Sequence, residues 1–202
     1  MGLKRVKPHE MGVVVRRGRV SGTRKPGLRL VPLGKLIRVD VRPRILDIVS
    51  QRLPSVDGTD MDFRYEVTYA IVDAEVAAMV KVHLPDDMER FITEDPFKNI
   101  EQLPTVIGYT CHYTLRTRVS ALRRADCLKK DEMAPILREG LSKVFKDTGV
   151  VFNEIVVTDA YPTNKGVEEG VAAITYQVVH PDGSTSILPI GGVDVHPAGL
   201  RR

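Results

Sequence analysis

The sequence predicts an α+β fold, in which an antiparallel β-sheet is followed by amphipathic helices and a closing strand. Three observations support this class. Residues 11–73 form a series of short β-type runs that are split by Gly and Pro. Residues 106–122 and 131–145 repeat apolar side chains every three or four positions, which is the period of an amphipathic helix. Another β-type run, residues 150–159, follows the second of these helices and ends at Pro162.

The N-terminal strands are short and rich in Val, Ile and Leu. They are predicted at residues 13–15, 28–31 and 37–41. The Ser, Gly and Pro content of residues 21–27 indicates a turn between the first two. Pro43 is expected to bend or end the third strand, because proline cannot donate a ladder hydrogen bond.

A hairpin is predicted in the next part of the chain. Residues 45–53 continue as an extended run, and Asp57-Gly58 supplies the pair of residues that a tight hairpin turn prefers. The strand after this turn alternates strictly between apolar and polar residues, as a half-buried strand does. Its apolar face consists of Met61, Phe63, Tyr65, Val67, Tyr69 and Ile71.

Capping residues predict where the helices begin and end. Asp73 is expected to cap a short helix over residues 74–80, and Asp95-Pro96 to open a second one. Pro104 is expected to kink or restart that second helix. Asp131 is predicted to cap a third helix, and Gly149 to close it in a left-handed conformation.

These elements suggest a division of the 202-residue chain into three parts. Residues 1–10 are predicted to be a loose basic arm, and residues 11–163 a folded domain. Residues 164–202 are predicted to be an extension containing a β-hairpin, with strands at residues 171–179 and 186–190 around the turn-forming residues 180–184. We expect this hairpin to pack on its own domain or on a neighbouring copy, because two strands alone are too few to be stable.

Charge is distributed unevenly along the chain. Residues 1–54 contain fourteen Lys and Arg against three acids, a net charge of +11, and the remainder has a net charge of −7. A basic end suggests an anionic partner, either phospholipid or nucleic acid, and the opposed charges suggest head-to-tail self-association. A solvated strand face is the alternative explanation. The candidate residues for binding an anionic surface are Lys4, Arg5, Lys7, Arg16, Arg17 and Arg19.

No constellation of catalytic residues is apparent. The five histidines are scattered, and Cys111 and Cys127 fit reduced cysteines of a cytosolic protein better than a disulfide. Neither a phosphate-binding glycine loop nor a Gly-x-Ser-x-Gly motif occurs. We therefore expect no enzyme activity, no metal and no cofactor. No stretch of about 18 apolar residues is present, so no transmembrane helix is expected.

Several segments, taken in order, resemble the band 7 or SPFH domain of stomatins, prohibitins and flotillins. The matching segments are residues 12–20, 26–32, 37–42, 67–77, 115–116 and 149–159. Their signatures include Val13-Val14-Val15-Arg16-Arg17-Gly18 at the start and Tyr69-Ala70-Ile71-Val72-Asp73 with Ala77 at the junction to the helices. The resemblance covers residues 11–163.

This resemblance implies an α+β domain that oligomerises, usually on a membrane, as a scaffold without catalysis. Members usually have an apolar anchor before the domain, and many have a coiled coil after it; residues 1–10 and 163–202 show neither pattern. We therefore expect a cytoplasmic homo-oligomer, peripheral on the inner membrane face, with sheet edges near Val13 and Ile155 available for assembly. The alternative is a nucleic-acid-binding protein that uses the basic N-terminal third. The sequence does not indicate client proteins.

Overall fold

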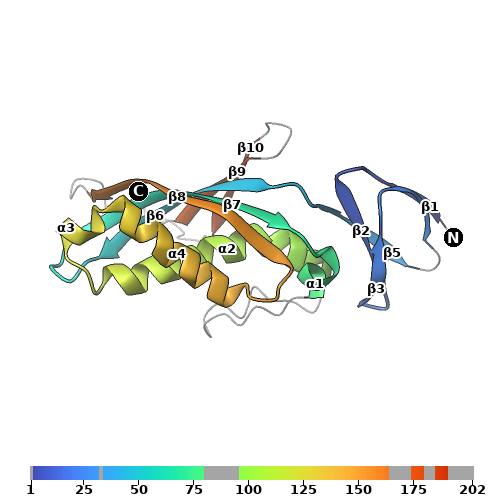
Figure 1. The fold of residues 1–202 in the computed structure, drawn as a ribbon, viewed down its shortest axis with the longest axis horizontal. Coiled ribbons are helices and arrows are strands. Elements are labelled where there is room, and N and C mark those ends of the chain that lie inside the picture. Colours follow the sequence, from blue (N-terminus) through green and yellow to red (C-terminus); the bar gives the residue numbers. More distant parts are fainter. Residues whose placement is uncertain (1, 32–33, 80–95, 164–173, 180–184, 191–202) are drawn as a thin grey trace, which may run out of the picture.

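The structure is a computed structural model, and it describes residues 2–31, 34–79, 96–163, 174–179 and 185–190. Figure 1 shows an elongated molecule, with β1 to β5 at one end and a sheet backed by helices along the rest. The strands are β1 (Gly2–Val6), β2 (Glu10–Arg16), β3 (Arg19–Arg24), β4 (Gly27–Val31), β5 (Lys35–Asp40), β6 (Arg44–Pro54), β7 (Asp60–Ile71), β8 (Val150–Pro162), β9 (Ile174–Val179) and β10 (Thr185–Ile190). The helices are α1 (Ala74–Met79), α2 (Pro96–Val119), α3 (Arg124–Cys127) and α4 (Lys130–Val144). The predicted α+β class is confirmed.

The main sheet is antiparallel and has the strand order β10-β9-β6-β7-β8. Strand β7, which lies between β6 and β8, has the alternation that the sequence predicts, since all six residues of its apolar face are at most 2% exposed. The tail strands pair with each other, and β9 also pairs with β6 over Ile45–Val49. The C-terminal hairpin therefore extends the sheet of its own domain.

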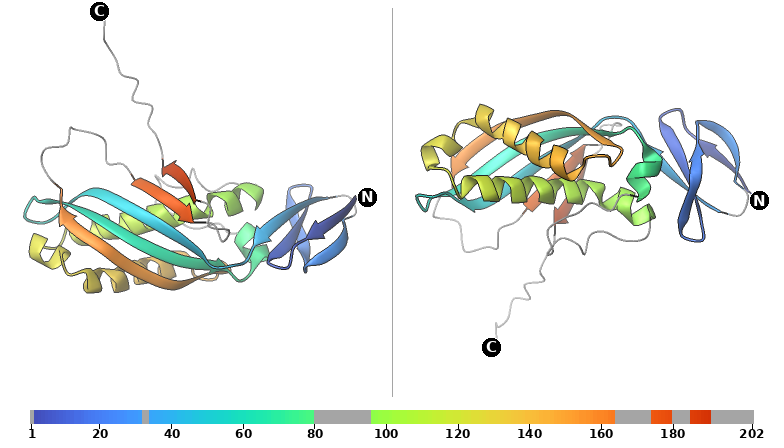
Figure 2. Two further views of the ribbon diagram at one scale, coloured as in Figure 1. Left: turned by 90° about the horizontal axis from the view of Figure 1, so that it is seen from above. Right: turned by 60° about the horizontal axis from the view of Figure 1, so that its bottom comes forward.

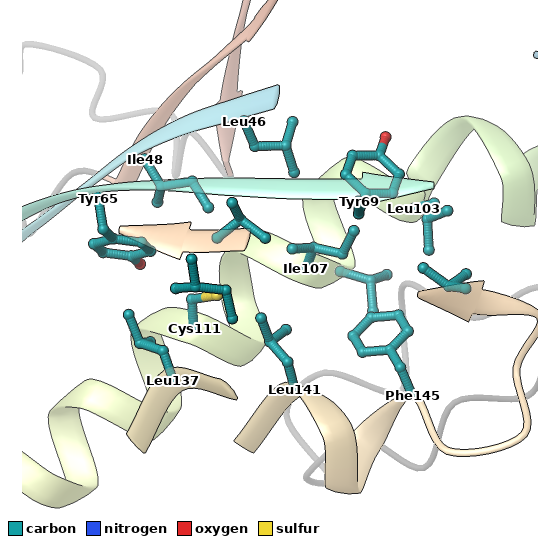
Figure 3. Packing of buried hydrophobic residues seen from close by; sticks show 14 of the residues in the cluster. Leu46, Ile48, Tyr65, Tyr69, Leu103, Ile107, Cys111, Leu137, Leu141 and Phe145 are labelled. Carbon is teal, nitrogen blue, oxygen red and sulfur yellow. The ribbon is translucent and has the colours of Figure 1, made fainter. Parts of the chain in front are cut away.

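Helices α2 and α4 cover one face of this sheet (Figures 1 and 2). Figure 3 shows Ile107 and Cys111 of α2 packing between the sheet and Leu137 and Leu141 of α4. Both cysteines are buried and free, as the sequence predicts, and burial raises the pKa of the Cys111 thiol far above its ordinary value. Helix α2 continues through Pro104 without a break, so the predicted restart there is wrong.

Two predicted helix boundaries are tested by the structure. Asp73 caps α1, because its Oδ1 accepts hydrogen bonds from the backbone N–H groups of Glu75 and Val76, each at 3.0 Å. Asp131 does not cap α4; it lies in the first turn, and Lys129 occupies the cap position without a side-chain hydrogen bond. An acid in the first turn still favours the helix through its dipole. Asp95 lies outside the described residues.

The β8 strand joins the helical layer to the sheet through Gly149. This residue has the expected left-handed conformation, φ +72°, but it does not close α4 as predicted, because that helix ends at Val144 with Phe145 at the cap position. Its carbonyl oxygen accepts hydrogen bonds from the N–H groups of Val72 at 2.8 Å and Asp73 at 3.1 Å. Gly149 therefore fixes the start of β8 against the end of β7 and the cap of α1.

Strands β1 to β5, called here the N-terminal module, form two layers. A three-stranded sheet has the order β3-β2-β5, and β1 pairs with β4 as a separate ribbon. Val6 and Val31 of the ribbon are 1% and 3% exposed. Val6 lies over Gly12, where an added Cβ would be 3.1 Å from its Cγ2. The other face of the three-stranded sheet contributes Val13, Ile37 and Val39 to the main core.

This module corrects two sequence-based expectations. Residues 1–10 are not a loose arm, since Gly2–Val6 pairs with Gly27–Val31 and buries Val6. Residues 21–24 belong to β3 rather than to a turn. The two errors have different causes. Strand β1 acquires its structure from a partner more than twenty residues away, whereas residues 21–24 belong to a local hairpin with β2 whose tight turn lies at Arg17-Gly18.

The hairpin between β6 and β7 depends on Asp57. Gly58 has φ +74°, and Asp57 accepts hydrogen bonds from the Ser55 hydroxyl and from the backbone N–H of Arg124 at the start of α3. The Ser55 hydrogen bond, followed by that of Arg124, lowers the pKa of Asp57 from 3.8 to about 2. The Asp57 carboxylate thus joins the hairpin to the helical layer.

We predict that the contribution of Asp57 to stability is present above pH 4 and lost at lower pH. A carboxyl group whose pKa is lowered by folding stabilises the fold above its unfolded-state pKa, and this contribution disappears as the pH falls from 3.8 through about 2. Asp57→Asn should lower the thermal midpoint at pH 7, and the difference from wild type should shrink between pH 4 and pH 2. A difference that is constant over this range would contradict the prediction.

Candidate functional site

The six basic residues that the sequence singles out lie in two separate groups. Lys4 and Arg5 are on β1 and Lys7 is in the turn after it, whereas the other three flank the turn between β2 and β3. All six side chains are exposed. The two groups are attached to opposite ends of β2, whose seven residues span about 20 Å. The structure therefore does not combine them into one cluster.

The β2–β3 turn concentrates positive charge at its tip. Arg17 and Gly18 have φ values of +50° and +76°, as a two-residue turn with two left-handed positions requires. Arg16 and Arg19 are cross-strand partners, and Lys35 is paired with the neighbouring Val15. Like charges placed directly opposite each other repel. An anion bound at this tip would relieve that repulsion.

The β1–β4 ribbon exposes a face that the sequence analysis missed. Leu3 is opposite Leu30 and Arg5 is opposite Leu28, so these four side chains share one face. The three leucines are 61%, 55% and 62% exposed, in the order Leu3, Leu30, Leu28. We call these four residues the leucine face. The alternation in Leu28-Arg29-Leu30-Val31 was a signal, but only the pairing with β1 shows which side is covered.

Basic residues surround the leucine face. Lys4 is opposite Arg29, directly behind it on the ribbon, and Lys7 follows the end of β1. The Arg29 guanidinium donates to the carbonyl oxygens of Lys25 and Pro26, each at 3.1 Å, which ties this arginine to the turn before β4. Glu10 is the one acid in residues 2–39, and it accepts a hydrogen bond from the Lys7 N–H at 3.0 Å. The ribbon thus combines exposed apolar side chains with a nearly pure cationic environment.

The leucine face lies at the far end of the molecule. Figures 1 and 2 show β1 and the N-terminus at one end of the long axis, opposite α3. A flat surface could therefore contact the ribbon while the helical layer stays at a distance from it.

A second exposed apolar row lies on strand β8, which forms one edge of the main sheet. Val151, Val156 and Tyr161 are 38%, 42% and 47% exposed. They are opposite Ala70, Glu66 and Asp62 of β7, and hence on the same face. The predicted edge near Ile155 is confirmed. The predicted edge near Val13 is wrong, because β2 lies between β3 and β5.

Other reactive groups do not converge on a site. Within the described ranges, no three or more His, Cys, Asp and Glu side chains are grouped closely enough to hold a metal ion. Burial, together with the charge of Arg116, lowers the pKa of His112 to about 4, so this side chain is neutral near pH 7. His83, His180 and His196 lie outside the described residues. Among the helices that the structure describes, none has the length and hydropathy of a membrane-spanning segment.

Comparisons with known proteins identify the family. A similar sequence is "Uncharacterized protein MJ0827" of Methanocaldococcus jannaschii, which is 33% identical over 76 residues. That alignment covers 37% of this chain and 38% of the relative, so the chain matches little more than a third of the relative's length. The model of the SPFH domain / Band 7 family matches residues 4–173, which include most of β1 and every residue of the leucine face except Leu3. This chain therefore belongs to the SPFH domain / Band 7 family.

Proposed function

We propose that this protein is a non-catalytic, self-assembling scaffold that attaches peripherally to the inner, cytoplasmic face of an anionic membrane. One observation carries the membrane part of the proposal: the ribbon that exposes three leucines also has Lys4, Arg5 and Arg29 on its two strands, with Lys7 in the turn that follows β1. Membership of the SPFH family supports both parts, because proteins of this family are often oligomeric and membrane-associated.

The two components of the ribbon suit the two layers of a bilayer surface. Burying a leucine side chain contributes ~1.5–3 kcal/mol when burial is complete. Each Lys or Arg near an anionic leaflet adds about 1 kcal/mol, and this attraction is screened by salt. With Arg5 in the leucine face and Lys4 and Lys7 beside it, the combined free energy of burial and attraction supports measurable but reversible binding. The turn at Arg16, Arg17 and Arg19 provides a second, purely electrostatic contact.

Self-assembly is supported by charge and by the sheet edge. Residues 1–54 and the remainder of the chain have opposite net charges, +11 and −7. A contact between unlike surfaces of successive copies closes into a ring or continues as a filament. The apolar row on the β8 edge is a second feature that favours self-assembly, because an exposed edge strand is a template for pairing with another chain. The division of the chain into residues 1–10, 11–163 and 164–202 stays a prediction.

Nucleic-acid binding is the alternative that the charge alone would allow. Proteins that bind single strands usually add aromatic stacking platforms to a basic groove. Residues 2–42, which contain the basic module, have no Phe, Tyr or Trp. Exposed leucines contribute nothing to contacts with phosphates, whereas they do contribute to a lipid interface. Exposed leucines beside basic residues, without aromatic residues, therefore favour lipid over nucleic acid as the partner.

Vesicle binding and particle size test this proposal together. The full chain should sediment with vesicles that contain 30% phosphatidylserine in phosphatidylcholine, and much less with phosphatidylcholine alone. Binding should fall when NaCl is raised from 50 to 500 mM, because the attraction of exposed charges is screened. Sedimentation velocity at tens of micromolar and low salt should show an oligomer.

Each part of the proposal has its own contrary outcome. Equal binding to both kinds of vesicle, or tighter binding to a 30-mer of RNA than to the anionic vesicles, would overturn the membrane role. A monomer under the sedimentation conditions would overturn self-assembly. Steady turnover in a hydrolase or nucleotide screen that a single substitution abolishes would contradict the absence of catalysis.

A further inference from the structure

We infer that successive copies of this chain join edge to edge, with strand β3 of one copy pairing antiparallel with strand β8 of the next. This inference rests on the self-assembly proposed above and names the surfaces that would carry it. Both strands lie at sheet edges in the described part of the chain: β3 beside β2, and β8 beside β7. Because β3 is in the N-terminal module and β8 is in the main sheet, the contact is between unlike surfaces.

The charges of the two strands are complementary in position. Strand β3 has Arg19 and Arg24 at its two ends, five residues apart. Strand β8 has Glu154 and Asp159, also five residues apart. In an antiparallel pairing that places Arg24 opposite Glu154, Arg19 falls opposite Asp159. Oppositely charged cross-strand pairs are favourable, so this register is selected over its neighbours.

The ladder geometry of the two strands agrees with this register. Residues 19–24 lie opposite Gly12–Arg16 of β2, so six residues span five positions and the strand contains one bulge. Residues 154–159 lie opposite Arg64–Thr68 of β7, again six residues over five positions with one bulge. The two arginines of β3 are therefore separated by the same number of ladder positions as the two acids of β8. The two arginines lie on one face of β3, and the two acids lie on one face of β8.

The middle of the proposed contact also fits. Between the two acids, Val156 is 42% exposed on the same face of β8. The β3 segment opposite it would be Ser21-Gly22, whose small side chains leave room for valine. The cores stay continuous as well: Val20 packs against the apolar core from β3, and Ile155 and Val157 from β8. Pairing would thus cover an exposed apolar residue and two strand edges at once. Lys130 already donates to the carbonyl oxygen of Thr158, the bulged residue of β8, at 2.6 Å and lies 3.9 Å from Asp159, so Arg19 would share that carboxylate with Lys130.

Charge reversal and mixing test the inference on the full chain. We would compare wild type with R19E/R24E and with E154R/D159R by sedimentation velocity at low salt. Each variant alone should shift to monomer, because every β3–β8 contact then brings like charges together. An equimolar mixture should regain the wild-type size, because β3 of each variant then meets β8 of the other with opposite charge. Matched reversals on the exposed helix surface, R116E/R118E and E101R/E139R, should keep the wild-type size.

A disulfide experiment measures the register directly. R24C/E154C should form chains linked between copies under mild oxidation, since cross-strand partners have Cα atoms about 4.5–5.5 Å apart. R24C/D159C is the matched control, because that register separates its two positions by about 13 Å. The native Cys111 and Cys127 are buried and do not compete.

The outcomes distinguish this inference from the proposed function. An oligomer that keeps its size in both reversed variants, a mixture that stays monomeric, or equal crosslinking of the control would overturn the β3–β8 contact while leaving self-assembly in place. A wild-type monomer would overturn both. Loss of assembly in each variant, recovery in the mixture and crosslinking specific to R24C/E154C would support the contact.

Discussion

Replacing Leu3, Leu28 and Leu30 together with serine should weaken binding to anionic vesicles by about 100-fold or more. The three side chains are more than half exposed and share one face, so all three can enter a lipid interface at the same time. Complete burial of a leucine contributes ~1.5–3 kcal/mol, and even a third to a half of this from each residue sums to about 3 kcal/mol. That free energy corresponds to roughly two orders of magnitude in affinity. Vesicle titrations with 30% phosphatidylserine would measure it.

The matched control replaces apolar residues that are equally exposed elsewhere. Val56, Val72 and Met79 are 60%, 61% and 49% exposed, and they lie outside the N-terminal module. Their triple substitution by serine should leave vesicle affinity within about 2-fold, since exposed changes of this kind rarely alter the fold. Thermal midpoints of both triple variants should stay close to wild type. If the two variants bind equally well, the leucine face does not contact lipid.

Replacing Gly149 with alanine should destabilise the protein by about 2–6 kcal/mol. Two costs combine at this position. The φ of +72° lies in the left-handed region, where a Cβ is unfavourable by ~1–3 kcal/mol. The added Cβ would also approach Asp73 too closely, at 3.0 Å from its Cβ and nearer still to its carbonyl oxygen. Overpacking against backbone adds ~1–3 kcal/mol, because the capped start of α1 cannot move freely. Urea unfolding followed by circular dichroism would measure the loss.

Gly58 offers a control with the same backbone conformation and no crowding. Its φ is +74°, and an added Cβ would have nothing within 4 Å. Gly58→Ala should therefore cost only the conformational term, ~1–3 kcal/mol. The difference between the two variants isolates the close approach of β8 to the α1 cap. Equal losses of stability in the two variants would mean that Asp73 moves away from the added Cβ, and that this junction is not rigid.

Local patterns predicted the central part of the fold. The alternation of residues 61–71 identified the inner face of β7, because a strand flanked by two neighbours buries one side whatever those neighbours are. Asp73 was identified as a helix cap and Gly149 as a left-handed residue because both properties depend on the residue itself, although α4 ends at Val144 and not at Gly149. Asp131 failed as a cap because the chain enters α4 two residues earlier, with Lys129 at the cap position.

The candidate site was predicted only in part. The basic residues were visible in the sequence, since charge is a property of composition. Their separation into the ribbon and the β2–β3 turn was not, because β1 pairs with a strand more than twenty residues later. The leucine face was missed for the same reason: alternation shows that Leu28 and Leu30 share a side, but not that Val6 and Val31 occupy the covered one.

The sequence by itself determined the class of the fold, the family, the charge division and the inner face of strand β7. These follow from local periodicity and composition, which act within a few residues. Only the tertiary structure decided that residues 2–6 form a strand, that the tail extends its own sheet, and that β3 rather than β2 lies at the edge of the N-terminal sheet. These features depend on which distant segments pair with each other. Strand pairing depends on how much of a whole sheet face is buried, and a short stretch of sequence does not contain that information.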